Sequence, residues 1–498
     1  MRYNFPMRIA MFVVVALAAC ASGGKPDNNG DVDASTGTDG VTTNPDAGCG
    51  GTNQLPCEGV YVAKNGNDTA SGTKGAPLRT IAMGIAKAGA TSQKAVFVRA
   101  GSYNEQIVMS PGVTVYGGFD ETWTRSPSVV TEIVGASPVV KFEAITVATA
   151  IDTFTIKADD ATVLGDSSYA VLAVNSQLVE LRDVTIDAGI GAAGTDGTNG
   201  VNGANGTAGQ AGNPGVERSS GLLCDSNPVP LGGQPGTSAC GRTGGVGGQP
   251  GVGGSGGNAG GTAISGVTPG GAGAPGESQN GSVGNNGFNG FNGGGGAGGL
   301  AAGTFNGTRY EPSNGTNGGD GGVGNGGGGG GGGGGGTTDC DSTGSSGGGG
   351  GGGGCAGTGG TGGGGGGGSF GVIAVDSSVV IRSSTVTANR GGAGGRGGTA
   401  GSGGIGGAGG AGGPYGGSAE QDDGGFGAAG GRGGNGGNGG PGGGGGGGPS
   451  AAVVCVGAAS INVPQTMLVA GTGGAGGTSP ANAGATGTST NAIGCQFF

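Results

Sequence analysis

The sequence contains no histidine and little of several other residue types that build active sites. Without histidine, Ser-His-Asp triads, imidazole general acid/base catalysis and His-ligated metals are excluded. Aromatic residues make up 4% of the chain, with one Trp, so a broad platform for stacking sugars is not expected. Proline occurs 21 times, too rarely for a collagen triple helix. The formal charge is −11 with no Lys/Arg-rich stripe, so nucleic acid is not expected as a partner.

Glycine dominates what the sequence does contain. It occupies 144 of the 498 positions, whereas an ordinary domain contains about 7% glycine. Hydrophobic residues are 33% of the chain, below the usual share of about 45–50%. Most of this chain therefore cannot form one ordinary globular core.

The N-terminus has the pattern of a secretory signal peptide over residues 1–19. Two arginines precede the apolar run at 9–19, which is too short to span a bilayer. The run ends in LAAC at Cys20, which resembles the lipobox of bacterial lipoproteins. The resemblance implies cleavage before Cys20 and lipidation of that residue. Because Ala21 is not aspartate, it also implies a position in the outer membrane or at the cell surface; a plain signal peptide followed by a chance cysteine remains open.

Eight cysteines follow Cys20, an even number that suggests disulfides in an exported chain. They are Cys49, Cys57, Cys224, Cys240, Cys340, Cys355, Cys455 and Cys495. Pairing each with its nearest neighbour (49/57, 224/240, 340/355 and 455/495) closes the shortest loops, and other connectivities remain open. Because no C-x₂-C spacing and no histidine occur, neither a metal site nor a cofactor is expected.

Residues 20–58 are rich in Gly, Asp, Asn and Thr, which predicts a flexible tether. The composition changes at 59–190, where short Val/Ile/Phe runs alternate with Gly/Pro/Asn turns. Leu78, Ile81 and Ile85 recur at helical spacing and predict a short helix over 77–88. Strands are predicted at 60–62, within 95–109 and 112–120, and at 132–134, 139–142, 153–156, 170–174, 178–181 and 184–186.

The 59–190 stretch resembles bacterial right-handed parallel β-helix proteins of the pectate-lyase-like superfamily. The residues that carry the resemblance are Tyr61-Val62-Ala63, Gly66-Asn67-Asp68, Gly72-Thr73, Pro77-Leu78-Arg79-Thr80-Ile81, Val96-Phe97-Val98, Gly101-Ser102-Tyr103 and Val115-Tyr116-Gly117-Gly118-Phe119. The resemblance implies an all-β solenoid whose open end is capped by the short helix. It implies nothing specific about activity.

A weak internal repeat extends the predicted solenoid through the chain. Its copies lie at 170–189, 371–391 and 452–471, and each is followed at once by glycine-rich sequence. Each copy is predicted to form one rung that stacks on its neighbours. This places rungs at 369–391 and 450–498, and glycine-rich insertions at 191–368 and 392–449.

The insertions have a period of three. Glycine occupies every third position from 191 to 215, and three residues per turn is the period of the polyproline-II helix. The period is compatible with a polyglycine-II-like bundle, and the composition with a flexible loop; both remain open. The uninterrupted run 326–336 has no such register and is expected to be loose. The tracts are similar in composition to the Gly-Gly-X regions of mycobacterial PE-PGRS proteins, without that family's partner domain.

Members of the pectate-lyase-like superfamily are often carbohydrate-active and use clustered acids with an Arg or Lys base. The candidates for such roles are Asp159, Asp160, Asp166, Arg182, Asp183 and Arg382. Solvated corners of the rungs explain these residues more simply, so no catalytic residue is expected.

We therefore expect a non-enzymatic, lipid-anchored envelope protein with a structural, adhesive or surface-interaction role. Its expected partners are the membrane, through Cys20, and polysaccharide or other cell-surface components. A polysaccharide lyase or hydrolase, and a passive spacer without a ligand, are the alternatives.

Overall fold

The computed structural model describes residues 55–216, 228–271, 273, 279–336, 342–414 and 424–496. The chain divides into two compact units, Met1–Cys57 and Glu58–Phe498, and the second contains every strand of the described residues. The predicted signal peptide, most of the predicted tether and four of the cysteines (Cys20, Cys49, Cys224 and Cys340) lie outside the described residues.

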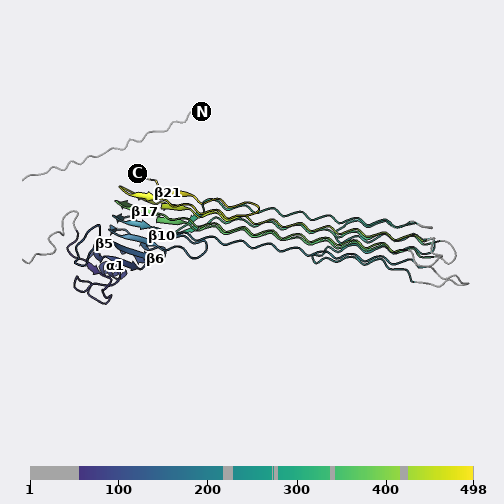
Figure 1. Ribbon diagram of the computed structural model, residues 1–498, viewed down its shortest axis with the longest axis horizontal. Coiled ribbons are helices and arrows are strands. Elements are labelled where there is room, and N and C mark those ends of the chain that lie inside the picture. Colours follow the sequence, from purple (N-terminus) through teal and green to yellow (C-terminus); the bar gives the residue numbers. More distant parts are fainter. Residues whose placement is uncertain are drawn as a thin grey trace, which may run out of the picture. The chain divides into compact units, whose positions relative to one another are not determined.

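Three stacked sheets of parallel strands form a β-helix (Figure 1). The first sheet contains, in spatial order, β1 (Val60–Val62), β2 (Ala95–Arg99), β5 (Thr114–Phe119), β8 (Thr149–Asp152), β11 (Val179–Arg182), β16 (Ser378–Arg382) and β19 (Ser460–Asn462). The second contains β4 (Ile107–Val108), β7 (Val140–Glu143), β10 (Ser168–Val174), β15 (Ser369–Val375), β18 (Ser450–Val456) and β21 (Ser489–Ile493). The third contains β3 (Gly101–Asn104), β6 (Thr131–Gly135), β9 (Thr155–Ala158), β12 (Thr185–Asp187), β17 (Thr385–Thr387) and β20 (Met467–Val469). The predicted parallel β-helix is confirmed.

The core fills the inside of the coil with aliphatic side chains stacked from rung to rung. Val171, Val372 and Val453 pair in register across β10, β15 and β18, and none of them is exposed to solvent. These three positions are equivalent in the three copies of the sequence repeat. Each copy is therefore a rung, as the repeat predicted, and the rungs bury one another because no single rung can enclose a core.

The helix α1 (Ile81–Ala90) covers the β1 end of the coil. Its Ile81 and Ile85 are buried, as the periodicity predicted, and Ala88 is buried with them. The helix begins later than the predicted residue 77 because Thr80 is its N-cap and accepts a hydrogen bond from the N–H of Met83. The Glu105 carboxylate accepts hydrogen bonds from two further free N–H groups of the first turn, those of residues 81 and 82, at 2.9 Å each. A negative charge at this end also complements the helix dipole.

Asp68 makes the start of α1 sensitive to acid. Its Oδ1 accepts hydrogen bonds from the N–H groups of Arg79 and Thr80, both at 2.9 Å. Burial raises the pKa of the Asp68 carboxyl, but the hydrogen bonds from Thr80 and Arg79 outweigh it and lower the pKa below 3.8. A carboxyl with a lowered pKa stabilises the fold above its unfolded pKa, and this contribution is lost as the pH falls through the folded value.

We therefore expect the melting temperature of the chain to fall as the pH drops below about 4, and to fall less in Asp68→Asn. The amide keeps an acceptor oxygen but does not titrate, which makes it a matched control. Thermal melts followed by circular dichroism between about pH 5 and pH 3 measure the difference. Identical pH profiles for the two chains would contradict this role of Asp68.

Three features of the fold differ from the expectations drawn from the sequence. The strand β8 is absent from the predicted strands, because its sequence TAID contains only one large apolar residue. The C-terminal region contains a third glycine-rich excursion at 470–488, between β20 and the final strand β21. A short antiparallel hairpin, β13 (Thr304–Asn306) and β14 (Arg309–Glu311), also lies within the first insertion.

Candidate functional site: the glycine-rich bundle

Three glycine-rich excursions leave the coil after strands of the third sheet and return into strands of the second. They span residues 188–368, 388–449 and 470–488. Figure 1 shows their extended segments running side by side away from the stacked strands. Backbone N–H to C=O hydrogen bonds join neighbouring segments along their length. We call this assembly of segments the glycine-rich bundle.

A ladder of serines holds the excursions where they join the coil. Ser168, Ser369, Ser450 and Ser489 stack in register through the second sheet. The Ser369 hydroxyl donates to the carbonyl of Gly189 at 2.7 Å and accepts from the N–H of Asn389 at 2.8 Å. The hydroxyls of Ser450 and Ser489 bind the backbone at the equivalent exits. Each excursion therefore begins from a fixed point on a rung.

The segment 326–336 lies in the interior of the bundle, and from Gly327 on it donates to three neighbours in turn. Successive N–H groups point in three directions because the segment turns once every three residues. The pattern repeats through 327–335. The first three bonds are Gly327 N–H to Gly351 O (2.9 Å), Gly328 N–H to Asn285 O (2.9 Å) and Gly329 N–H to Gly261 O (3.0 Å).

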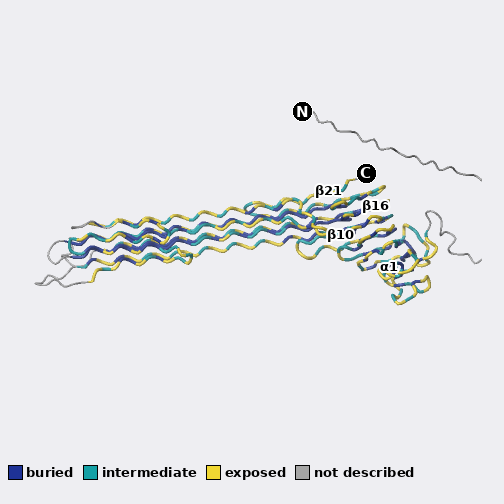
Figure 2. The backbone as a smooth tube through the Cα atoms, turned by 180° about the vertical axis from the view of Figure 1, so that it is seen from behind, coloured by how far each residue is buried: buried dark blue, intermediate teal, exposed yellow. Residues whose placement is uncertain are grey.

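The carbonyl groups of the same segment accept hydrogen bonds from three further neighbours. The bonds are Gly245 N–H to Gly327 O, Gly431 N–H to Gly328 O and Gly270 N–H to Gly329 O, each at 2.8 Å. The run 326–336 thus has six neighbouring segments, and its residues are buried (dark blue in the interior of the bundle in Figure 2). The bundle satisfies the backbone groups that an isolated extended chain leaves to water.

The prediction that 326–336 is loose is therefore wrong. A Cβ atom on Gly330 would overlap the carbonyl oxygen of Ala428, and the other glycines at 326–330 would likewise meet neighbouring backbone. A segment surrounded on all sides needs glycine at every position, so it shows no period of three. At the edge of the bundle, 191–215 keeps one glycine in three, and the intervening side chains after Ala192, such as Val201 at 69%, are exposed. The ordered, polyglycine-II-like alternative is confirmed.

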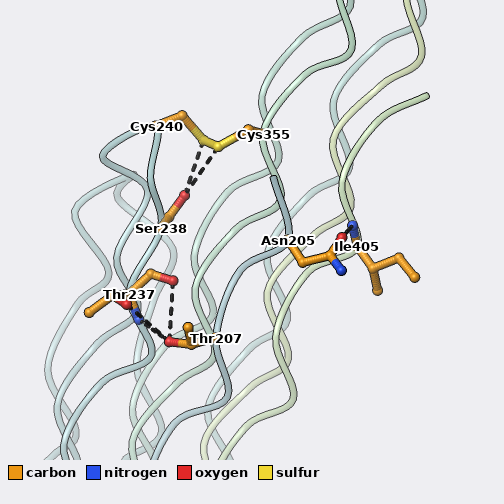
Figure 3. The surroundings of a disulfide bond; sticks show 7 residues. All are labelled: Asn205, Thr207, Thr237, Ser238, Cys240, Cys355 and Ile405. Carbon is orange, nitrogen blue, oxygen red and sulfur yellow. Dashed lines mark hydrogen bonds between the residues drawn. A yellow bond between two sulfur atoms is a disulfide. The ribbon is translucent and has the colours of Figure 1, made fainter. Parts of the chain in front are cut away.

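Asparagine side chains complete the hydrogen bonding at the edges. The N–H of Thr399 donates to Asn199 Oδ1 at 2.9 Å, while the N–H of Gly200 donates to the Thr399 carbonyl at 2.8 Å. In one Asn-Gly step, the asparagine side chain thus binds the N–H of a residue in a parallel neighbouring segment, and the glycine N–H binds the C=O of that same residue. The same arrangement recurs every three residues at Asp196, Asn202 and Asn205, and Figure 3 shows Asn205 with Ile405. We call a series of such steps an asparagine ladder.

A second asparagine ladder joins the segments 279–300 and 424–449. Its members are Asn280, Asn286, Asn289 and Asn292, which accept from the N–H groups of Phe426, Arg432, Asn435 and Asn438. The following glycines donate to the carbonyls of the same four residues. Sequence reasoning missed both ladders, although Asn-Gly or Asp-Gly at a spacing of three was their signal.

A disulfide between Cys240 and Cys355 cross-links two segments of the bundle (Figure 3). The two Cα atoms lie 5.6 Å apart, although the residues are 115 positions apart in the sequence. Local pairing is therefore wrong for these two cysteines, because the first insertion folds back on itself and brings distant segments together. Local pairing is confirmed for Cys455 and Cys495. Cys57 is also disulfide-bonded.

The charged residues of the coil form a separate cluster on the first sheet. Asp152, Arg182 and Arg382 lie in register on β8, β11 and β16. Asp152 pairs with Arg182 at 3.0 Å and with Arg125 at 2.5 Å, and Glu180 pairs with Arg382. A hollow of about 310 Å³ lies beside Glu180 and Arg182. The cluster thus joins two carboxylates to three guanidinium groups. Sequence reasoning missed Asp152 and Arg125.

The other candidate residues named from the sequence are dispersed. Asp160 accepts a hydrogen bond from the N–H of Ile190, Asp166 pairs with Arg309, and Asp183 has a left-handed backbone (φ 50°) at a rung corner. Asp159 lines a hollow beside Glu105. The structure therefore brings Arg182 and Arg382 together, with Asp152 and Glu180 rather than the four aspartates as their ion-pair partners. Among the described residues, no group of three or more His, Cys, Asp or Glu side chains is placed to hold a metal ion.

The fold and the bundle together define a class of protein: a parallel β-helix that carries an ordered, hydrogen-bonded bundle of glycine-rich segments. Residues 64–187 match the model of a family described as Protein of unknown function (DUF1565), a family associated with β-helix proteins. No curated protein and no solved structure matches the chain. Within the described part of the chain, no helix has the length and apolar character needed to cross a bilayer.

Proposed function

We propose that this chain is a lipid-anchored protein of the bacterial cell envelope whose glycine-rich bundle has a structural or surface-interaction role, without catalysis. The observation that carries the proposal is the interior segment 326–336 with its six hydrogen-bonded neighbours. Such a segment has no side chains and therefore no side-chain chemistry to offer. What it supplies is an ordered, backbone-bonded extension fixed to a β-helix.

Two features support an envelope location. The disulfides Cys240–Cys355 and Cys455–Cys495 are typical of proteins that fold in an oxidising compartment. The lipobox-like LAAC follows a short apolar run, which favours a lipid anchor on Cys20. Lipid chains contribute to membrane binding by about 0.8 kcal/mol for each buried CH₂. The bundle would then be held outside the membrane for adhesion, spacing or contact with polysaccharide.

Cys20→Ala is expected to release the protein from the membrane fraction and to abolish acyl labelling. The reason is that LAAC resembles a lipobox, and the cysteine of a lipobox is the residue to which lipid is attached. Metabolic labelling with a fatty-acid analogue, followed by membrane fractionation, measures both effects in cells that express the full chain. Ala21→Ser is the matched control and should stay labelled and bound. An unlabelled wild-type chain, or a Cys20→Ala chain that still sediments with membranes, would refute the anchor.

A polysaccharide lyase or hydrolase is the second candidate. The hollow beside Glu180 and Arg182, with the arginine 5.9 Å from the centre of the Tyr116 ring, favours it. Incubation of the full chain with acidic polysaccharides and calcium tests it. Unsaturated or shortened products that disappear in Arg182→Ala would support an enzyme, and their absence with retained polysaccharide binding would support the non-catalytic role.

A further inference from the structure

The Asn-Gly steps of this chain carry a known chemical reactivity. In such a step, the glycine nitrogen loses its proton to base and attacks the asparagine Cγ. The new C–N bond closes a succinimide ring as the bond from Cγ to Nδ2 breaks and ammonia leaves. Water then opens the ring at one of its two carbonyls and gives aspartate or isoaspartate. Glycine favours this reaction because no side chain shields its nitrogen.

The asparagine ladders restrain both reacting groups. At Asn199, the side-chain oxygen accepts the N–H of Thr399, and the glycine nitrogen that would attack donates its proton to the Thr399 carbonyl at 2.8 Å. Ring closure therefore requires both bonds to break at once. It also requires the step to leave the extended conformation, which the neighbouring segments hold in place. The reaction must then proceed through local opening of the bundle, and its rate is reduced by the cost of that opening.

One Asn-Gly step of the described residues lacks the hydrogen bond on its glycine N–H. Asn306 ends β13, and Gly307 begins the two-residue turn that leads into β14; both residues are exposed. The backbone of Gly307 is left-handed (φ 59°), as in the tight turns of hairpins. No hydrogen bond holds its N–H, whereas the glycine N–H is bonded in every other Asn-Gly step that the structure describes. The Asn306 side chain is bonded only through Nδ2, which donates to Glu311 Oε1 at 2.9 Å.

We propose that Asn306 is a modification site, at which the folded protein deamidates spontaneously to aspartate and isoaspartate while the ladder asparagines are preserved. The product places a new carboxylate against Glu311, where Nδ2 was a donor. Like charges at this distance repel, and isoaspartate also lengthens the backbone of a tight turn. The hairpin holds Tyr310, whose ring lies 5.5 Å from Phe370 of β15. Deamidation therefore loosens the contact between hairpin and coil.

The ladders themselves tolerate one of the two products. Asp196 already occupies a ladder position, and its carboxylate accepts the N–H of Arg396 at 2.7 Å. An aspartate formed at Asn199 would accept the same N–H group, whereas isoaspartate would shift the register of every later glycine in the segment. Isoaspartate in a ladder would therefore disturb the packing of a whole segment and not only one hydrogen bond.

The test is to hold the purified full chain at mildly alkaline pH and to map aspartate and isoaspartate by peptide mass spectrometry. The expected result is deamidation at Asn306, with the ladder steps at least about tenfold slower. In the same chain unfolded in guanidinium, all Asn-Gly steps should react at similar rates. Ladder steps that react as fast as Asn306 in the folded chain, or an Asn306 that is no more reactive than they are, would overturn the proposal.

Two variants test whether the ladder hydrogen bonds, and not burial alone, slow deamidation. Thr399→Pro removes the single N–H that Asn199 accepts, and proline is compatible with the extended segment. It should raise deamidation at Asn199 and leave Asn202 unchanged. Asn306→Gln should abolish the fast reaction and keep the hairpin. Equal protection of Asn199 in Thr399→Pro and wild type would show that the ladder bond is not the protecting element.

Discussion

Gly330→Ala is expected to disrupt the glycine-rich bundle at a cost of about 3 kcal/mol or more in unfolding free energy. The new Cβ would overlap the carbonyl of Ala428, and no flexible side chain is available to move aside. The segments must separate, which breaks the bond from Gly330 N–H to Gly348 O and leaves buried backbone groups without partners. Chemical denaturation followed by amide exchange measures the loss.

Gly294→Ala is the matched control for this prediction. Gly294 also lies in an extended segment of the bundle, but no atom lies within 4 Å of its ideal Cβ position. A substitution at such an exposed site is expected to change stability by no more than about 0.5 kcal/mol. The contrast between the two alanines tests close packing rather than glycine content. Equal effects at positions 330 and 294 would argue against a packed bundle.

The double substitution Cys240→Ser/Cys355→Ser is expected to destabilise the bundle by about 2–5 kcal/mol. The disulfide closes a loop of 115 positions, and a cross-link over a long loop removes much freedom from the unfolded chain. Protection of amides in 242–253 and 342–354 should fall, while amides of β10 and β15 keep theirs. Exchange measured by mass spectrometry on the full chain resolves these regions.

Cys455→Ser/Cys495→Ser is the corresponding control, because that disulfide joins β18 to the residues after β21 in the coil. It should lower protection at the β21 end of the coil and leave the bundle intact. A Cys240→Ser/Cys355→Ser chain with unchanged protection throughout the bundle would mean that backbone hydrogen bonds alone fix its segments.

The β-helix could be predicted from the sequence because its signals are local. Strands such as Val60–Val62 are recognisable as β-branched runs between turns, and the three repeat copies mark rungs far apart in the chain. The strand β8 was missed because it is held by pairing with β5 and β11 rather than by its own composition. Pairing of that kind depends on which strands become neighbours, and no local pattern encodes it.

The bundle could be predicted only at its edges. Where glycine occurs at every third position, as in 191–215, the remaining side chains reveal which face is covered. In the interior run 326–336, all faces are covered and the sequence carries no pattern, so it is indistinguishable from a flexible linker. The same limitation hid the Cys240–Cys355 pairing, since the return path of the first insertion determines which segments meet.

The charged cluster on the first sheet illustrates a further limit. Arg182 is recognisable at a rung corner, but its partner Asp152 lies on the strand that sequence reasoning missed. Arg125, the other partner of Asp152, lies in the turn region after β5 and has no distinguishing pattern. Stacking in a solenoid brings such residues together at positions set by the length of each rung.

The uninterrupted glycine run 326–336 is an ordered, hydrogen-bonded interior segment of the bundle. Hydrogen–deuterium exchange of the amides at 327–335 in the full chain tests it most directly. The structure predicts protection comparable to that of the core strand β15, because each of these N–H groups donates to a neighbouring segment. Exchange of the run at the rate of an unstructured peptide, while β15 remains protected, would contradict the account.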